Sequence, residues 1–321
     1  MKKLRIVLTN SIHAEGMKIL EPLGEVILPP DDSDATLLEV VRDADALIVR
    51  KKLPETIVND ASKLQVIVRH GVGVDYIPVK AATERGVIVA NVPTANTQSV
   101  VEHVIGVLIL LARKFHRLDQ SWRRTPWNIR DQIQCCELYG KTVGIVGFGR
   151  IGSKVGRICR EAFSMQLRVF DPYYTGGDVE QSDLYTLFSE SDFITLHSPL
   201  TTDTLGLVNA ELLSRMKPSA YLINAARGGL VDEQALSSIL ADGKIAGAAL
   251  DVFQDEPISN DSPLLELDNV VLTPHTAALT TDSIIAMSTE SAREVERVLS
   301  GSMPKNIVNP DVIPLFDERF R

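Results

Sequence analysis

The sequence predicts an α/β protein with two doubly wound parallel sheets, and three observations support this fold class. Apolar runs rich in β-branched residues alternate with helical patterns along the chain, which is typical of parallel sheets covered by helices on both faces. The chain has 321 residues, 45% of them hydrophobic, which is enough for two domains with substantial cores. A glycine-rich turn also follows one of the apolar runs.

The predicted strands fall into two series. The first consists of residues 4–9, 25–29, 46–50, 64–70 and 87–92. The second begins at Lys141 and consists of residues 142–147, 167–171, 192–197, 220–224, 247–252 and 269–273. Six strands match the number in a complete dinucleotide-binding sheet, so the second half is the expected cofactor domain.

Two long helices complete the predicted elements. Ser99 and Glu102 have the spacing of a capping box, and apolar residues recur at helical spacing after them. Because this helix is apolar on more than one face and joins the two series, we expect it to be buried where the domains meet. The second helix spans about 281–300 and ends before Gly301 and Pro304.

The turn after the run 142–147 has the pattern of a dinucleotide site. Gly147 permits a tight turn, Gly149 lets backbone N–H groups approach a pyrophosphate, and Gly152 lets the following helix pack close to the strand. Asp171 ends the next apolar run, nineteen residues after Gly152. A carboxylate there accepts hydrogen bonds from the adenosine ribose of NAD and repels the extra phosphate of NADP. The sequence therefore predicts NAD and a Rossmann domain.

A second turn, at 70–75, also follows an apolar run and starts with G-x-G. Tyr76 stands where the third glycine would be, so this turn is not predicted to bind a dinucleotide. The residues alone leave two interpretations open: a plain strand-to-helix turn, or a turn whose backbone lines a ligand pocket.

Charge and composition exclude other classes of protein. A net charge of −9 without a basic block argues against nucleic acids and acidic membrane surfaces as partners. The longest apolar run, 104–112, is too short to span a bilayer, and the N-terminus lacks the apolar core of a signal peptide. Cys135, Cys136 and Cys159 have no metal-ligand spacing, and the histidines do not cluster. We expect reduced thiols, no metal site and a cytoplasmic protein.

Three polar residues follow strands of the second series and are the candidate catalytic residues. Arg227 lies in a glycine turn, Glu256 beyond the next strand and His275 beyond the last. Open α/β sheets bind ligands at the carboxyl ends of their strands. Arg227 either grips a carboxylate or forms a structural ion pair. Glu256 and His275 either form a proton-transferring pair or, taken singly, are a loop carboxylate and a capping histidine.

Five motifs in order resemble those of the D-isomer-specific 2-hydroxyacid dehydrogenases, within which the phosphoglycerate dehydrogenase and hydroxypyruvate reductase branch is most similar. They are G-F-G-R-I-G at 147–152, H-S-P-L-T at 197–201, N-A-A-R-G-G at 224–229, D-V-F with E-P at 251–257, and T-P-H-T-A at 273–277. The resemblance implies a Rossmann NAD-binding domain at 100–300. It also implies a flavodoxin-like substrate domain formed by 1–99 and 301–321, and a homodimer joined through the cofactor domains.

The resemblance also implies residue roles. Arg227 would bind the carboxylate and carbonyl oxygen of the substrate, Glu256 would hold the imidazole, and His275 would donate the proton in reduction. Backbone groups of Val72 and Gly73 would bind the substrate carboxylate, which favours the ligand-pocket interpretation of the 70–75 turn. The implied cofactor contacts are Val72, Gly147, Gly149, Arg150, Ile151, Gly152, Asp171, His197, Pro199, Thr204, Ala225, Asp251, His275 and Ala277, with Asp251 holding the nicotinamide carboxamide.

The implied reaction is hydride transfer between C4 of the nicotinamide and C2 of a small 2-hydroxy or 2-oxo acid. The candidates are 3-phosphoglycerate, glycerate with hydroxypyruvate, glyoxylate, lactate and sulfolactate. Arg50, with Lys51 and Lys52, either binds a phosphate or sulfonate or forms a solvated basic turn. Trp122 and Trp127 either close the pocket or pack.

The sequence departs from the family pattern in two places. The segment 276–278 reads Thr-Ala-Ala, where the family commonly has Ile-Ala-Gly, so substrate preference is expected to differ. The chain stops soon after Pro310, so we expect no regulatory extension and no serine feedback through one.

Two other functions are compatible with this fold. An NAD(H)-sensing corepressor would not need the proton-transferring pair, so Arg227, Glu256 and His275 argue against it. Formate dehydrogenases of this superfamily pair the histidine with glutamine, which Glu256 disfavours, whereas phosphite oxidation stays open.

Overall fold

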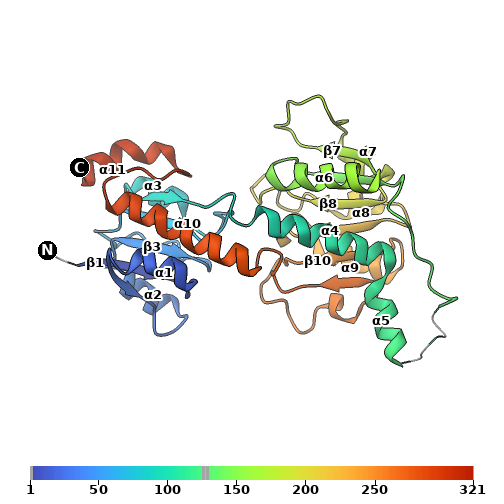
Figure 1. Cartoon of the computed structure of the whole chain (residues 1–321), viewed down its shortest axis with the longest axis horizontal. Helices are drawn as coiled ribbons and strands as arrows, with labels where there is room; N and C mark the ends of the chain where they lie inside the picture. The colour runs from blue at the N-terminus through green and yellow to red at the C-terminus, as the bar shows by residue number, and fades with distance from the viewer. Residues whose placement is uncertain (1–2, 125–126, 128–129, 321) are drawn as a thin grey trace. The chain divides into compact units, whose positions relative to one another are not determined.

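A computed structural model describes the chain except for residues 1–2, 125–126, 128–129 and 321. It contains two compact units, each built on a parallel β-sheet (Figure 1). The first unit comprises residues 1–96 and 279–321, and the second comprises 97–278. The predicted fold class, two parallel α/β sheets, is confirmed.

The sheet of the first unit has the order β2-β1-β3-β4-β5. This is the doubly wound order of flavodoxin-like sheets. Its strands are β1 (Leu4–Leu8), β2 (Gly24–Ile27), β3 (Ala46–Val49), β4 (Val66–Arg69) and β5 (Ile88–Ala90). Alternate strand residues enter two cores, because successive side chains of a strand point to opposite faces. Val7 packs with the helices α2 (Asp34–Val41) and α3 (Val79–Glu84), whereas Ile6 and Leu8 pack with α1 (Ala14–Leu20).

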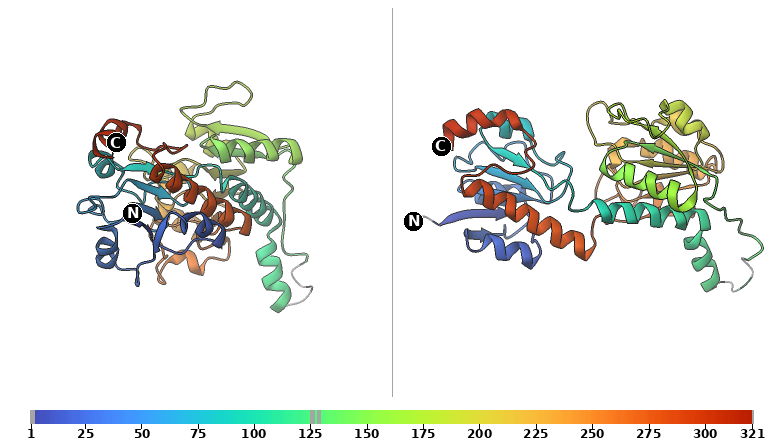
Figure 2. Two further views of the ribbon diagram at one scale, coloured as in Figure 1. Left: turned by 60° about the vertical axis from the view of Figure 1, so that its left-hand side comes forward. Right: turned by 45° about the horizontal axis from the view of Figure 1, so that its top comes forward.

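The C-terminal part of the chain completes the first unit. The helix α10 (Thr281–Leu299) packs on α1, β3 and β4, and α11 (Ile313–Phe320) also lies in this unit, as the red segments beside the blue strands in Figure 2 show. Asn309 accepts a hydrogen bond from the N–H of Val89 (2.8 Å) and donates one to the carbonyl of Val87 (3.1 Å).

The second unit ends at residue 278, and not at residue 300 as expected. The limits of α10 agree with the predicted 281–300, and the Thr280 side chain caps its start. We expected this helix in the second unit, but it belongs to the first, since Ala292, Val295 and Val298 are buried against the first sheet.

The sheet of the second unit has the order β11-β10-β9-β8-β6-β7. Its strands are β6 (Thr142–Val146), β7 (Gln166–Phe170), β8 (Phe193–Leu196), β9 (Tyr221–Asn224), β10 (Gly247–Leu250) and β11 (Val270–Leu272). The strand order reverses between β6 and β8. Such a topological switch point is where open α/β sheets bind ligands.

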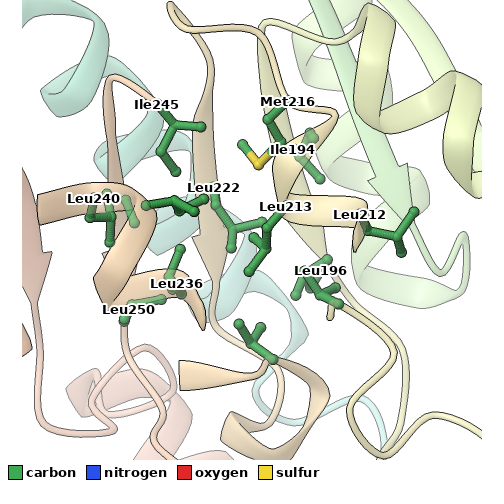
Figure 3. Close-up of a cluster of buried hydrophobic side chains, with 14 of the residues drawn as sticks. Ile194, Leu196, Leu212, Leu213, Met216, Leu222, Leu236, Leu240, Ile245 and Leu250 are labelled. Atoms are coloured by element: carbon green, nitrogen blue, oxygen red, sulfur yellow. The ribbon is translucent and has the colours of Figure 1, made fainter. Parts of the chain in front are cut away.

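Helices cover both faces of the second sheet. On one face lie α4 (Thr97–Arg113) and α6 (Arg150–Phe163). On the other lie α7 (Leu184–Glu190), α8 (Ala210–Ser214) and α9 (Glu233–Ala241). Figure 3 shows the aliphatic core of this second face, where Leu196 and Leu222 from the strands pack near Leu213 and Leu236 from the helices. Burial of such side chains is the main source of stability of the sheet.

Two helices near the start of the second unit differ from each other in burial: α4 has many buried residues and α5 (Phe115–Arg124) has none. The helix α4 begins at Thr97, so the predicted cap was wrong: Ser99 is a buried residue inside the helix. The helix α5 extends away from the rest of its unit (Figure 1). None of the helices within the described residues is long and apolar enough to cross a membrane.

Candidate active site

The glycine turn lies between β6 and the start of α6. The surroundings of Gly147, Gly149 and Gly152 differ, so a side chain would have a different effect at each position. Gly147 has a φ of +92°, and a Cβ atom there would lie 2.7 Å from the backbone nitrogen of Ser198. A Cβ at Gly152 would lie 2.1 Å from the carbonyl oxygen of Gly147, so only glycine lets the helix approach the strand this closely. At Gly149, the N-cap of α6, a Cβ would meet no atom within 4 Å. The helix end is therefore open to a ligand.

Asp171 is directly beside this turn. It follows β7, and its Oδ2 accepts a hydrogen bond from the N–H of Phe148 (2.7 Å), while its Oδ1 accepts one from Tyr173 (2.8 Å). Each carboxylate oxygen can accept about two hydrogen bonds, so both retain capacity for ribose hydroxyls. An open helix N-terminus, a close-packed glycine turn and this carboxylate fit the pyrophosphate and ribose of a dinucleotide.

The other predicted cofactor contacts of the second unit follow further strands of the same sheet. His197 follows β8; burial lowers the pKa of its imidazole to about 4, so the ring is neutral near pH 7. The Thr204 hydroxyl donates a hydrogen bond to the carbonyl of Pro199 (2.7 Å) and thereby closes the next turn. Ala225 follows β9, and Arg150 with Ile151 forms the first turn of α6.

His275 and Glu256 form a direct pair. The ring Nδ1 lies 2.7 Å from Oε2 of Glu256, whose Oε1 accepts a hydrogen bond from the N–H of Phe253 (3.1 Å). Burial acts to raise the pKa of Glu256, but the hydrogen bond and charge of His275, the N–H of Phe253 and the charge of Arg227 together lower it below its usual value. Glu256 is therefore ionised near neutral pH and holds Nδ1, which leaves Nε2 for a substrate.

Arg227 is presented by a turn that Asn224 and Gly228 shape. Asn224, at the end of β9, is buried; it donates a hydrogen bond to the carbonyl of Arg227 (2.9 Å) and accepts one from the N–H of Ala226 (3.1 Å). A Cβ at Gly228 would lie only 1.9 Å from the carbonyl carbon of Phe253. The backbones that carry Arg227 and Glu256 are thus in contact, as an arginine beside an acid/base pair requires.

Asn224 is a structural contributor that sequence reasoning missed. It is the first residue of the N-A-A-R-G-G motif at 224–229, whose pattern gives it no role by itself. A buried asparagine at a strand end, just before a glycine turn, is the available signal, since its amide can satisfy two backbone groups at once.

Asp251 follows β10 and is only 2% exposed. Its carboxylate accepts hydrogen bonds from the hydroxyl of Thr273 (2.6 Å) and from the N–H groups of Thr276 (2.8 Å) and Ala277 (2.9 Å). The structure therefore joins two of the predicted cofactor contacts, Asp251 and Ala277, to the segment that carries His275.

Three predicted substrate contacts belong to the first unit. The carbonyl of Val72 accepts a hydrogen bond from Asn91 (2.7 Å) and that of Gly73 accepts one from Arg69 (3.0 Å). Within the described residues, we find no acceptor for the N–H groups of Val72 and Gly73, so these donors are open to an anion. Arg50 donates a hydrogen bond to the carbonyl of Ser11 (2.6 Å).

The remaining candidates have simpler surroundings. Trp122 and Trp127 are both exposed and contact each other, with ring centroids 5.9 Å apart, so neither packs in a core. Cys135, Cys136 and Cys159 are free thiols. Across the described part of the chain, no group of three or more His, Cys, Asp or Glu side chains could hold a metal ion.

The fold and this site define a dinucleotide-binding α/β protein with an arginine and a glutamate–histidine pair on one edge of the cofactor sheet. Comparison with known families identifies the class further. Residues 105–277 match the NAD binding domain of the D-isomer specific 2-hydroxyacid dehydrogenases. The chain belongs to this family, as the motifs predicted.

Individual relatives differ in substrate and length. The chain is 42% identical over 319 residues to a D-3-phosphoglycerate dehydrogenase of Methanocaldococcus jannaschii, covering 97% of this chain and 60% of that protein. It is 36% identical over 324 residues to a glyoxylate reductase of Korarchaeum cryptofilum, covering 97% of each. The chain thus spans about three fifths of the length of the first of these relatives.

A solved structure has the same fold along nearly the whole chain. It is an NADPH-dependent glyoxylate/hydroxypyruvate reductase from Sinorhizobium meliloti in complex with NADP and malonate, with a TM-score of 0.88 and 30% identity, covering 97% of this chain and 98% of that chain.

Proposed function

We propose that this chain is an NAD-dependent dehydrogenase of a small D-2-hydroxy acid, in which Arg227, Glu256 and His275 carry the chemistry. The observation that carries the proposal is the 2.7 Å contact between His275 Nδ1 and Glu256 Oε2, on the sheet edge that also bears the glycine turn. NAD bound there would supply the exchange of a hydride at C4 of its nicotinamide.

The residues of this chain handle the proton and the acid group. His275 gives a proton from Nε2 to the carbonyl oxygen of a 2-oxo acid, or takes one from the hydroxyl in the reverse direction. Glu256 stays ionised and fixes the ring through Nδ1. Arg227 binds the substrate carboxylate through its planar guanidinium.

We propose 3-phosphoglycerate, or glycerate with hydroxypyruvate, as the substrate. Support comes from the 42% identity to a D-3-phosphoglycerate dehydrogenase. Glyoxylate is the alternative, since a glyoxylate reductase is 36% identical. Lactate, sulfolactate and phosphite are further candidates.

The function is tested by measuring NADH oxidation with the 2-oxo acids that correspond to these candidates, both with and without a phosphate or sulfonate group. NAD reduction is measured with phosphite. Saturable turnover of phosphohydroxypyruvate or hydroxypyruvate is expected. Activity restricted to glyoxylate, pyruvate or phosphite would replace the proposed substrate. Tight NADH binding without turnover of any acid would contradict the enzymatic proposal and favour an NAD(H) sensor.

Asp171→Ala is expected to weaken the preference for NAD over NADP. The carboxylate sits beside the glycine turn, 2.7 Å from the N–H of Phe148, where it would repel a 2′-phosphate. The ratio of kcat/KM for NAD to that for NADP should fall by about tenfold or more, mainly through KM for NAD. Asp183→Ala, which removes the exposed cap of α7, is the control for a lost surface carboxylate. An unchanged ratio would mean that other residues set the preference.

We also propose that the chain forms a homodimer through the second unit. The helix α5 has no fully buried residue, and Phe115, Trp122, Trp127 and Tyr139 are exposed large aromatic residues in this part of the unit. Exposed apolar clusters of this kind mark interfaces between proteins. Light scattering should give a mass of twice the 35.2 kDa of one chain, and a single-chain mass at high concentration would contradict the proposal.

A further inference from the structure

The segment 273–277 carries His275. Most of its backbone N–H groups donate hydrogen bonds to Leu250, the last residue of β10, or to Asp251, which follows it. The N–H of Thr273 donates to the carbonyl of Leu250 (3.0 Å), and the N–H of His275 donates to the carbonyl of Asp251 (2.8 Å). The N–H groups of Thr276 and Ala277 donate to the two carboxylate oxygens of Asp251. Asp251 alone therefore binds three successive amides of this segment, through its backbone and its side chain.

His275 adopts a backbone conformation that needs such support. Its φ is +52°, in the left-handed region that side-chain-bearing residues rarely occupy. A residue is held there only when surrounding contacts determine its conformation. The amides on both sides of this bend are those bound by Asp251, so the same contacts that fix the bend also set the direction of the imidazole.

The carboxylate of Asp251 is largely committed to this segment. Its Oδ1 accepts hydrogen bonds from the Thr273 hydroxyl (2.6 Å) and the Thr276 amide (2.8 Å) and a longer one from the Thr276 hydroxyl (3.5 Å), so that oxygen has no acceptor position left. Its Oδ2 accepts one from the Ala277 amide (2.9 Å). Since the residue is 2% exposed, one acceptor position at most, on Oδ2, is left for a cofactor group.

We propose that Asp251 is a positioning residue for His275: its buried carboxylate holds the left-handed bend of 273–277, so that Nδ1 meets Glu256 and Nε2 faces the substrate. The consequence for turnover rests on the proposed function, whereas the orientation of the ring does not. This role is separate from holding the nicotinamide carboxamide, the role implied for Asp251 by resemblance. The two roles predict different effects for a variant that removes one hydrogen bond and leaves Asp251 in place.

Thr273→Val is that variant, because valine has nearly the shape of threonine but lacks the hydroxyl that binds Asp251 Oδ1. Thr273→Ser is its matched control, since it keeps the hydroxyl. We expect Thr273→Val to lower kcat about fivefold to tenfold with KM for NAD unchanged, because a hydrogen bond to a charged group is lost. Thr273→Ser should restore most of kcat. Asp251→Asn should lower kcat further, because an amide cannot accept hydrogen bonds at both positions.

A readout that does not depend on turnover is the tautomer of His275. Long-range proton–nitrogen NMR correlations at alkaline pH report which ring nitrogen carries the proton, and His275→Asn assigns the signals. In the parent protein the proton should lie on Nδ1, facing Glu256. We expect a mixture of tautomers in Thr273→Val and the parent pattern in Thr273→Ser.

The outcomes separate this proposal from the proposed function. A parent-like ring signal and a parent-like kcat in Thr273→Val would overturn the positioning role, and a change confined to KM for NAD would assign Asp251 to the cofactor alone. If no acid is turned over by the parent protein, the function fails, but the NMR comparison still decides the role of Asp251. Equal melting temperatures of Thr273→Val and Thr273→Ser would exclude general destabilisation as the cause.

Discussion

His275→Ala is expected to lower turnover by ~10² or more while leaving the affinity for NADH nearly unchanged. The imidazole is the group that would exchange the proton with the substrate oxygen, and the adjacent Glu256 would otherwise fix it through Nδ1 at 2.7 Å. The glycine turn and Asp171, which would bind the dinucleotide, lie on other strands of the sheet and should be undisturbed. Steady-state kinetics and a fluorescence titration with NADH give the two quantities.

A second histidine provides the control for this prediction. His103 lies on α4 and has no part in the candidate site, so His103→Ala should retain nearly full turnover. Turnover close to that of the parent protein in His275→Ala would remove the proton-transfer role. A large loss of NADH affinity in the same variant would instead assign His275 mainly to cofactor binding.

Gly228→Ala is expected to have the largest effect on the architecture of the site. The added Cβ would lie 1.9 Å from the carbonyl carbon of Phe253 and 2.0 Å from its oxygen, both backbone atoms that cannot rotate away. The turns that carry Arg227 and Glu256 must then separate, at a cost of ~1–3 kcal/mol or more of folding free energy. Thermal unfolding should show the lower stability, and kcat should fall because the arginine and the acid/base pair no longer share one site.

The neighbouring Gly229→Ala is a closely matched control. Its added Cβ would lie 3.1 Å from Cδ2 of Leu200, the end of a flexible side chain that can shift. We expect a much smaller loss of stability and nearly full turnover. Similar behaviour of the two alanine variants would show that the contact between the two turns is not needed for the site.

The sequence was sufficient to predict those features that depend on local pattern. The alternation of apolar strands and helices gave both sheets, and the spacing of Gly147, Gly149, Gly152 and Asp171 matches the observed turn and the carboxylate beside it. The sequence also indicated Arg227, Glu256 and His275, because each follows a predicted strand and parallel strands have their carboxyl ends on the same side of the sheet.

The features that the sequence could not give depend on contacts between distant residues. The helix α10 belongs to the first unit because Ala292, Val295 and Val298 pack in its core, a contact with residues that are far away in the sequence. The partners of Asp251 come from a segment more than twenty residues away, and no spacing rule identifies them. Ser99 matched a capping pattern, but α4 begins two residues before it, and both Thr97 and Ser99 are buried.

The return of the C-terminal segment to the first sheet has a consequence for biosynthesis. The second unit is one continuous stretch, 97–278, so all of it is synthesised before α10. The first sheet must wait for α10, for Asn309 to satisfy the edge strand β5, and for Phe316 to cover the core. The cofactor unit is thus the part that can fold first on the emerging chain, while the N-terminal strands keep an exposed apolar face until α10 and α11 have emerged.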